Sequence, residues 1–165
     1  YTVVDLETTG LDPLKNEILE FGAIKVRKGE IINRYEKLVR VSGNIPTVIS
    51  QITGITTELV QQKGEPLKES LIEFLEFIEE EQLLFYNVPF DMGFLIQACG
   101  ICDLPVPENP CVDVLKMAHK KLGGMPNYKL STVAEHFGLD KQKHRALEDC
   151  ILTQQVFLKL NEIGL

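Results

Sequence analysis

Three apolar, β-branched runs follow one another in the first 41 residues, and no other feature limits the possible folds as strongly. The runs cover residues 1–6, 18–27 and 31–41. Short runs of this kind, separated by polar turn residues, are typical of β-strands. The link Lys28-Gly29-Glu30 predicts a tight hairpin, because glycine adopts the backbone conformations that such turns require. The chain is therefore expected to open with an antiparallel β-meander.

Helical and strand patterns alternate after the meander. Residues 67–80 carry apolar side chains at the i, i+4, i+7 and i+8 spacing of an amphipathic helix. The elements expected in this part are helix 67–80, strand 83–86, helix 89–99, a last strand over 111–115 that leads into another helix, and helices 130–137 and 146–160, with a polar loop and short helical pieces over 42–64. The last helix is expected to bury the stripe Leu147, Ile151, Gln154 or Gln155, and Leu158. This order predicts an α/β fold with one mixed sheet.

The length and composition indicate one domain over residues 1–165. No run approaches the roughly 20 apolar residues of a membrane helix, so no membrane partner is expected. The four cysteines lack the pattern of a small secreted protein, which favours a cytoplasmic location. Because the sequence does not begin with methionine, something is expected to precede Tyr1, either trimmed residues or the rest of a larger protein.

Two carboxylates, Asp5 and Glu7, stand two positions apart at the end of the first apolar run. Residues i and i+2 of a strand point to the same face, so both would project together. Like charges this close repel one another unless a cation lies between them. The pair alone is no proof of a site, because such acids more often face solvent or cap a turn.

Two further acidic positions lie at expected helix starts. Asp91 falls in the first turn of the helix over 89–99, where the helix dipole alone would favour an anion. Asp149 follows His144 by five residues, and five residues turn a helix by about 500°, so the two would not share a helical face. They converge only if His144 lies in the preceding loop; otherwise His144 is an exposed histidine beside a solvated face.

Taken together, these residue types match the needs of a metal site that acts on phosphate. Hard cations such as Mg²⁺ and Mn²⁺ prefer carboxylate oxygens. Two such cations can clamp the attacking and leaving oxygens of a phosphoryl displacement. The net charge of −7 argues against a large basic surface for nucleic acid. It does not exclude an enzyme of nucleic acids, because bound cations make an acidic pocket locally positive.

Three segments resemble the exonuclease motifs of one family. They are VDLETTG at residues 4–10 (with Val3 before them), NVPFDMGFL at 87–95 and HRALED at 144–149. Their order and separation are similar to those of the DEDDh, or DnaQ-like, 3′–5′ exonucleases, which include epsilon-type proofreading exonucleases of bacterial DNA polymerase III. The resemblance covers nearly the whole chain. It implies a ribonuclease-H-like fold with a five-stranded mixed sheet flanked by helices.

The resemblance also implies a role for each motif residue. Asp5, Glu7 and Asp149 would hold the catalytic metal, and Asp91 would contribute mainly to a second one, both ions being Mg²⁺ or Mn²⁺. His144 would act as general base, which suits an imidazole near neutral pH. The reaction implied is hydrolysis of single-stranded DNA from its 3′ end, with release of 5′-mononucleotides.

Further residues would bind the terminal nucleotide. Backbone amides of Thr8, Thr9 and Gly10 are expected to contact it, and Leu11 resembles the apolar wedge of the family. The remaining expected contacts are Thr53, in a loop where some relatives have histidine, and the pocket residues Asn87 and Phe90. Tyr86 departs from the histidine of many relatives, and its side chain is expected to point into the sheet.

Several alternatives remain open at this point. The enzyme could act on RNA, because sugar selection depends on the shape of the pocket around the 2′ position. The chain could instead be a catalytically silent nucleic-acid-binding or scaffold module, or an unrelated α/β domain with coincidental acids. DNA is favoured over RNA as the substrate, and a DNA polymerase or a helicase is the expected partner.

Overall fold

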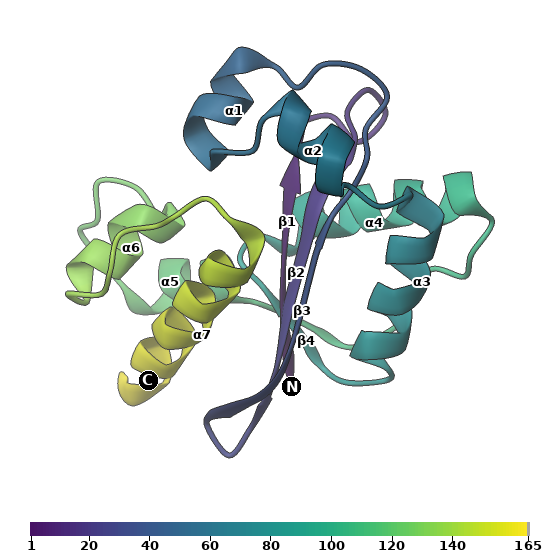
Figure 1. Ribbon diagram of the computed structural model, residues 1–165. Helices are drawn as coiled ribbons and strands as arrows, with labels where there is room; N and C mark the ends of the chain where they lie inside the picture. Colours follow the sequence, from purple (N-terminus) through teal and green to yellow (C-terminus); the bar gives the residue numbers. More distant parts are fainter. Residues whose placement is uncertain (165) are drawn as a thin grey trace.

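A five-stranded mixed sheet forms the centre of the computed structural model, which describes residues 1–164 (Figure 1). The strand order is β3-β2-β1-β4-β5. β1 pairs antiparallel with β2, and β2 with β3, whereas β4 runs parallel to both β1 and β5. The strands are β1 (Thr2–Thr8), β2 (Ile18–Arg27), β3 (Glu30–Leu38), β4 (Leu83–Phe85) and β5 (Cys111–Asp113). The predicted meander and mixed α/β sheet are confirmed.

β1 continues two residues further than expected, and this extension positions the first two acids. Side chains alternate along the strand, so Val4 and Leu6 enter one apolar layer while Val3 enters the other. Asp5 and Glu7 share the face of Val3. The register with β2 breaks between Glu7 and Thr8.

Seven helices cover the sheet and its end. They are α1 (Thr47–Thr53), α2 (Thr57–Lys63), α3 (Leu67–Ile78), α4 (Val88–Cys102), α5 (Val114–Lys121), α6 (Leu130–His136) and α7 (Ala146–Glu162). Figure 1 shows α3 and α4 on one side of the sheet and α5, α6 and α7 on the other. α1 and α2, the two short helices of the polar segment, lie over the end at which β1 finishes.

Each side of the sheet has its own apolar core. Phe21, Phe74 and Phe94 are buried on the side of α3 and α4. Val3, Val114 and Val156 are buried on the side of α5 and α7. The two apolar layers are separate. A residue that packs in one layer can therefore line a site at the strand ends only from that side of the sheet.

Two sequence expectations were wrong in detail. The third strand ends at Leu38 rather than at 41. Val39 still donates its N–H to the Leu19 carbonyl of β2 at 2.9 Å, but it forms an isolated parallel bridge with Glu65, and the chain beyond it does not continue the ladder with β2. The expected stripe of α7 is also displaced, since Leu158 is 39% exposed. The buried side chains of α7 include Ala146, Asp149, Cys150, Thr153, Gln154, Val156 and Leu160. The expected stripe is rotated from the buried one, which contains Leu152, Val156 and Leu160. Gln154 is buried as expected, and Leu147 and Ile151 are half-buried against the core.

No helix within residues 1–164 combines the length and the apolar composition needed to cross a membrane.

Candidate active site

A cleft of about 720 Å³ lies where β1 and β4 end, which is the edge at which α/β sheets bind ligands. Its lining comes from both sides of the sheet. Residues near the ends of β1 and β4, the first turn of α4, α5, the start of α6 and the start of α7 all contribute. The lining includes eight of the residues singled out from the sequence: Asp5, Glu7, Leu11, Asn87, Phe90, Asp91, His144 and Asp149.

Three of the predicted metal ligands meet at the floor of this cleft. One carboxylate oxygen from each of Asp5, Glu7 and Asp149 lies within 4.8 Å of the others. Asp5 and Glu7 project from one face of β1, and α7 packs across that face with Asp149 in its first turn. Residues more than 140 positions apart in the sequence thus form one cluster of oxygen ligands.

Burial and mutual repulsion make these carboxylates reluctant to ionise. Burial, followed by the charges of Asp91, Glu7 and Asp149, raises the pKa of Asp5 well above its usual range. Burial and the nearby Asp149 raise the pKa of Glu7 to about 9. A divalent cation would remove this cost, because it favours the charged form of each ligand.

Asp91 joins the cluster from the opposite side of the sheet. It lies in the first turn of α4 with only 3% of its surface exposed, and burial raises its pKa well above the usual range. The buried Oδ2 atoms of Asp5 and Asp91 have no hydrogen-bond partner among residues 1–164. Buried polar atoms are rarely left unpaired, so unused carboxylate oxygens aimed into a cleft fit a hard cation.

Asp113 fixes the start of α4 and was not expected from the sequence. Its carboxylate accepts hydrogen bonds from the backbone N–H groups of Asn87 and Val88, each at 3.1 Å. It also accepts the N–H of Leu115 at 3.1 Å and so caps α5. The acid at the end of β5 thereby sets the position of the helix that carries Asp91.

His144 lies in the loop before α7, as its spacing from Asp149 required. Its backbone φ is +57°, an uncommon value for a residue other than glycine. The turn brings its N–H to Asp149 Oδ1 at 3.2 Å, while Gln142 Nε2 donates to Oδ2 at 2.9 Å. Both bonds favour the ionised form of Asp149, although burial has the larger effect and raises its pKa. Gln142 gave no sequence signal beyond its polarity.

A buried ion pair anchors the start of α7 to β2. Glu20 is fully buried and accepts three hydrogen bonds from the Arg145 guanidinium, at 2.7 to 3.2 Å. It also accepts the N–H of Ala146 at 2.9 Å. Gly22 allows this approach, because a Cβ there would lie 2.5 Å from the Ala146 backbone. The pair therefore fixes the residues on either side of it, His144 and Asp149.

Replacing Arg145 with methionine is expected to lower the free energy of unfolding by about 3 kcal/mol, the lower end for a broken buried pair, because Glu20 loses its counter-charge. Denaturation by urea would measure the loss. Arg34→Met on the exposed part of β3 is the matched control and should stay within about 0.5 kcal/mol of the original chain. Equal stability of the two variants would contradict the anchoring role.

The predicted nucleotide contacts separate into two groups. Leu11, Asn87 and Phe90 line the cleft. The Leu11 side chain is 84% exposed, so its apolar surface is available for contact with a ligand. Asn87 has a φ of +80°, which turns the chain sharply from β4 into α4. The role of these residues in substrate binding stays a prediction.

The other group, Thr8, Thr9, Gly10 and Thr53, is not in the cleft lining found among residues 1–164. The N–H of Thr9 donates to the Glu17 carbonyl at 2.9 Å, and the expected contact of these backbone amides with a nucleotide stays a prediction. The Thr53 hydroxyl donates to the Ile49 carbonyl at 2.8 Å inside α1. A Cβ on Gly10 would lie 2.4 Å from Asn16 Oδ1, so this glycine is needed for the turn itself.

Tyr86 differs in part from expectation. It packs partly against the core on the side of α5 and α7, but it also lines the cleft, and its hydroxyl donates to the backbone carbonyl of Tyr128. His119, Tyr128 and Lys129 line the same wall and were not expected, because α5 and the loop after it carry no recognised motif.

Comparison with known proteins shows the family of this chain. A family model described as an exonuclease, RNase_T, matches residues 2–157. The PolC-type DNA polymerase III of Thermotoga petrophila is 41% identical over 165 residues, which are 99% of this chain but 12% of that protein. The DNA polymerase III subunit epsilon of Aquifex aeolicus is 35% identical over 164 residues, covering 98% of this chain and 80% of the relative. The chain thus spans about an eighth of the PolC-type relatives.

Solved structures share the fold at lower identity. E. coli exonuclease I in complex with a dA16 oligonucleotide matches with a TM-score of 0.83 and 20% identity, over 98% of this chain and 40% of that one. Exonuclease X in complex with 5′ overhanging duplex DNA matches with a TM-score of 0.76 and 23% identity, over 98% and 90%. With a family model that extends over almost its entire length, this chain belongs to the DnaQ-like exonuclease family, and epsilon-type and PolC-type DNA polymerase III proteins are among its relatives.

Proposed function

We propose that this chain is a two-metal 3′–5′ exonuclease that hydrolyses single-stranded DNA and releases 5′-mononucleotides. The observation that carries the proposal is the convergence of Asp5, Glu7 and Asp149 within 4.8 Å at the floor of the cleft. Asp91 enters the same cleft from the other side of the sheet. Such a set of acidic oxygen ligands suits Mg²⁺ or Mn²⁺.

The four carboxylates are proposed to hold the two cations. Asp5, Glu7 and Asp149 would bind one of them, and Asp91 would contribute mainly to the other. When bound, the ions supply charge stabilisation for the attacking and leaving oxygens of the displacement. The unpaired, buried oxygens of Asp5 and Asp91 support this assignment, because a carboxylate without donors is left for a cation.

His144 is proposed as the general base. Its side chain lines the cleft beside Asp149, within the same loop that the Glu20–Arg145 pair anchors. The imidazole would accept a proton from the attacking water as the new P–O bond forms. The bond from phosphorus to the 3′ oxygen of the preceding nucleotide then breaks, and that oxygen takes a proton from solvent.

The terminal nucleotide is proposed to occupy the side of the cleft formed by Leu11, Asn87 and Phe90. Phe90 packs on Phe94 with ring centroids 5.2 Å apart, which holds its ring in place. Leu11 would contact the terminal base from the turn after β1. Thr8, Thr9, Gly10 and Thr53 would then support this region mainly through the turn and helix that they stabilise.

DNA is proposed over RNA because the relatives are named as DNA polymerase III proteins and the solved neighbours were determined with DNA. A DNA polymerase, in the same chain or as a separate subunit, is the proposed partner. We also propose that residues 1–165 act as one domain and that they work in the cytoplasm.

The test is digestion of 5′-labelled single-stranded DNA and of RNA of the same sequence, with Mg²⁺, with Mn²⁺ and with EDTA. A metal-dependent ladder that shortens from the 3′ end, faster on DNA, is the expected result. A 3′-phosphorylated strand distinguishes polarity, because it should resist digestion while a 5′-phosphorylated strand does not. Intact strands in every lane would favour the silent scaffold module, and faster cleavage of RNA would reassign the substrate.

A further inference from the structure

Two stretches of the chain that lie on opposite sides of the sheet differ strongly in charge. Residues 114–145, which form α5, α6 and the loop before α7, carry seven lysines and arginines against two acids. Residues 65–108, which form α3, α4 and their connections, carry ten acids against one lysine. A polyanion approaching this acidic protein therefore meets an attractive field mainly on the side of α5 and α6.

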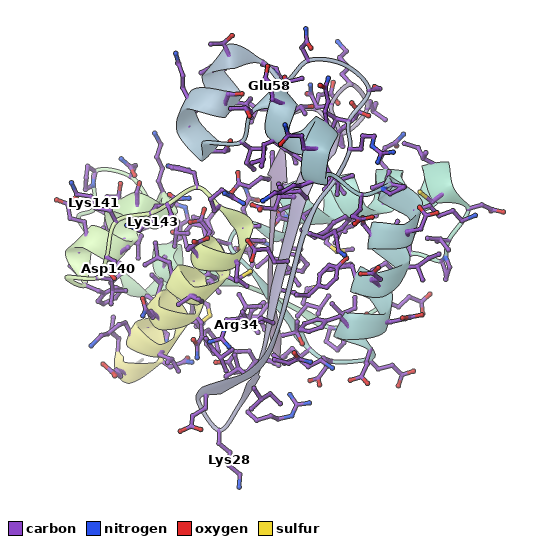
Figure 2. The ribbon with its side chains drawn as sticks, viewed as in Figure 1. Lys28, Arg34, Glu58, Asp140, Lys141 and Lys143 are labelled. Carbon is purple, nitrogen blue, oxygen red and sulfur yellow. The ribbon has the colours of Figure 1, made fainter. Side chains whose placement is uncertain are left out.

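Most of these cations have no acidic partner within the protein. Arg145 pairs with Glu20, and Lys121 donates to the carbonyls of Leu160 and Ile163. Among residues 1–164 the remaining five form no ion pair: Lys116, Lys120, Lys129, Lys141 and Lys143. Figure 2 shows Lys141 and Lys143 on the loop beside α6, away from Lys28 at the tip of the β2–β3 hairpin.

One part of this basic side enters the cleft itself. His119 and Tyr128 stack with their ring centroids 3.9 Å apart, and both line the cleft together with Lys129. Tyr128 is held at two points, because its hydroxyl donates to the Leu122 carbonyl at 2.7 Å and its own carbonyl accepts the Tyr86 hydroxyl. His119 is exposed, so in this stack the Tyr128 ring is fixed and the His119 ring is accessible to a ligand.

This aromatic and basic wall stands across the acidic floor from the wall of Leu11 and Phe90. Phe90 packs into the core on the side of α4, whereas Tyr128 packs into the core on the side of α5 and α7. A strand whose terminal nucleotide lies against Phe90, with its scissile phosphate at the carboxylates, continues toward His119. Stacking on aromatic rings and a nearby lysine is how proteins hold single strands irrespective of sequence.

We propose that His119, Tyr128 and Lys129 bind the nucleotide on the 5′ side of the scissile bond, the base on the stacked rings and its phosphate on Lys129. This inference rests on the proposed function and names a second nucleotide position in the same cleft. It also explains how a chain of net charge −7 attracts a polyanion: the net charge conceals one basic side.

The test compares two substrates that differ in this nucleotide. Oligothymidylate has it, whereas the p-nitrophenyl ester of thymidine 5′-monophosphate lacks it and reports the chemistry alone. In His119→Ala and Lys129→Gln, the ratio of kcat/KM on the oligonucleotide to kcat/KM on the ester is expected to fall about tenfold, the usual size of one lost stacking or phosphate contact. Lys129→Gln should also reduce the slope of log KM against log salt concentration by about 0.7.

Lys68→Gln is the matched control, because Lys68 is an exposed lysine of α3 on the acidic side and should leave the ratio within twofold. The inference would be overturned if the ratio did not change in either cleft variant, or if polyglutamate competed with the substrate as strongly as oligothymidylate does. Hydrolysis of the ester would still support the proposed function in that case. If the original chain hydrolyses neither substrate, both fail. Melting temperatures of the variants check that the ratio does not reflect unfolding.

Discussion

Replacement of Asp5 by asparagine is expected to lower kcat about a thousandfold or more, because each cation supplies several kcal/mol of charge stabilisation and the cluster would lose one of its ligands. The side chain keeps its size, so the fold should persist. Single-turnover digestion of labelled DNA in Mg²⁺ measures the loss, and calorimetry with Mn²⁺ should detect weaker binding. Asp140→Asn, in the exposed loop labelled in Figure 2, is the control with the same chemistry and should retain full activity.

The same variant should be more stable than the original chain when no metal is present. Burial and repulsion raise the pKa of Glu7 to about 9, so between about pH 4.5 and 9 the folded state holds a proton that the unfolded state has lost. The stability contributed by that proton is complete below this window and disappears as the pH rises through 9. Burial, Asp91, Glu7 and Asp149 raise the pKa of Asp5 in the same direction, so a neutral amide at this position removes the part of the pH dependence that Asp5 itself contributes.

In EDTA, Asp5→Asn is therefore expected to melt about 3 °C or more above the original chain, which corresponds to about 1 kcal/mol, and the gap should be wider at pH 9 than at pH 6. Added Mn²⁺ should reverse the order, because only the original chain has the complete ligand set. A variant that melts lower in EDTA would mean that Asp5 is a structural residue and not a metal ligand.

Replacement of His144 by glycine is expected to lower kcat by about 10²–10⁴-fold, the usual contribution of a general base. Glycine suits this position, because the backbone there has a φ of +57° and its N–H must still reach Asp149. Affinity for Mn²⁺ should change little, since the four carboxylates remain. Digestion under saturating DNA gives the effect on kcat.

Added imidazole separates a chemical role of His144 from a structural one. If the side chain accepts the proton, imidazole in solution should restore part of the activity of His144→Gly. His136→Ala, an exposed histidine of α6, provides the control and should act like the original chain. A His144→Gly variant with a normal rate, or one that imidazole leaves unchanged while Mn²⁺ binding is lost, would contradict the proposed role.

The sequence predicted most elements of the fold because each depends on a local repeat. The hairpin at Gly29, the buried run of β4 and the amphipathic pattern of α3 all arise from residues within a few positions of one another. The prediction failed where burial departed from hydrophobicity. α7 packs across β1 and β2 and buries Asp149, Thr153 and Gln154 on the same face as Leu152, Val156 and Leu160. The expected stripe was therefore rotated toward Leu158, which is exposed.

The site divides in the same way. The spacing of Asp5 and Glu7 along one strand, and the separation of His144 from Asp149 by a loop, followed from backbone periodicity alone. The partners that hold these residues came from elsewhere in the chain and had no local signal. Only the three-dimensional structure identified three of these partners: Gln142, which donates to Asp149; Asp113, which accepts from the start of α4; and Glu20, which pairs with Arg145.

The sequence by itself thus determined the type and order of the strands and helices and the chemical groups at the ends of three of them. Only the tertiary structure decided which face of the sheet each group shares, which carboxylate oxygens remain without a donor and that His119 and Tyr128 form a wall of the cleft. The physical reason is the separation along the chain of the residues that interact. Periodicity records how one element meets its surroundings, whereas a contact between residues 5 and 149 exists only after a helix has packed on a sheet.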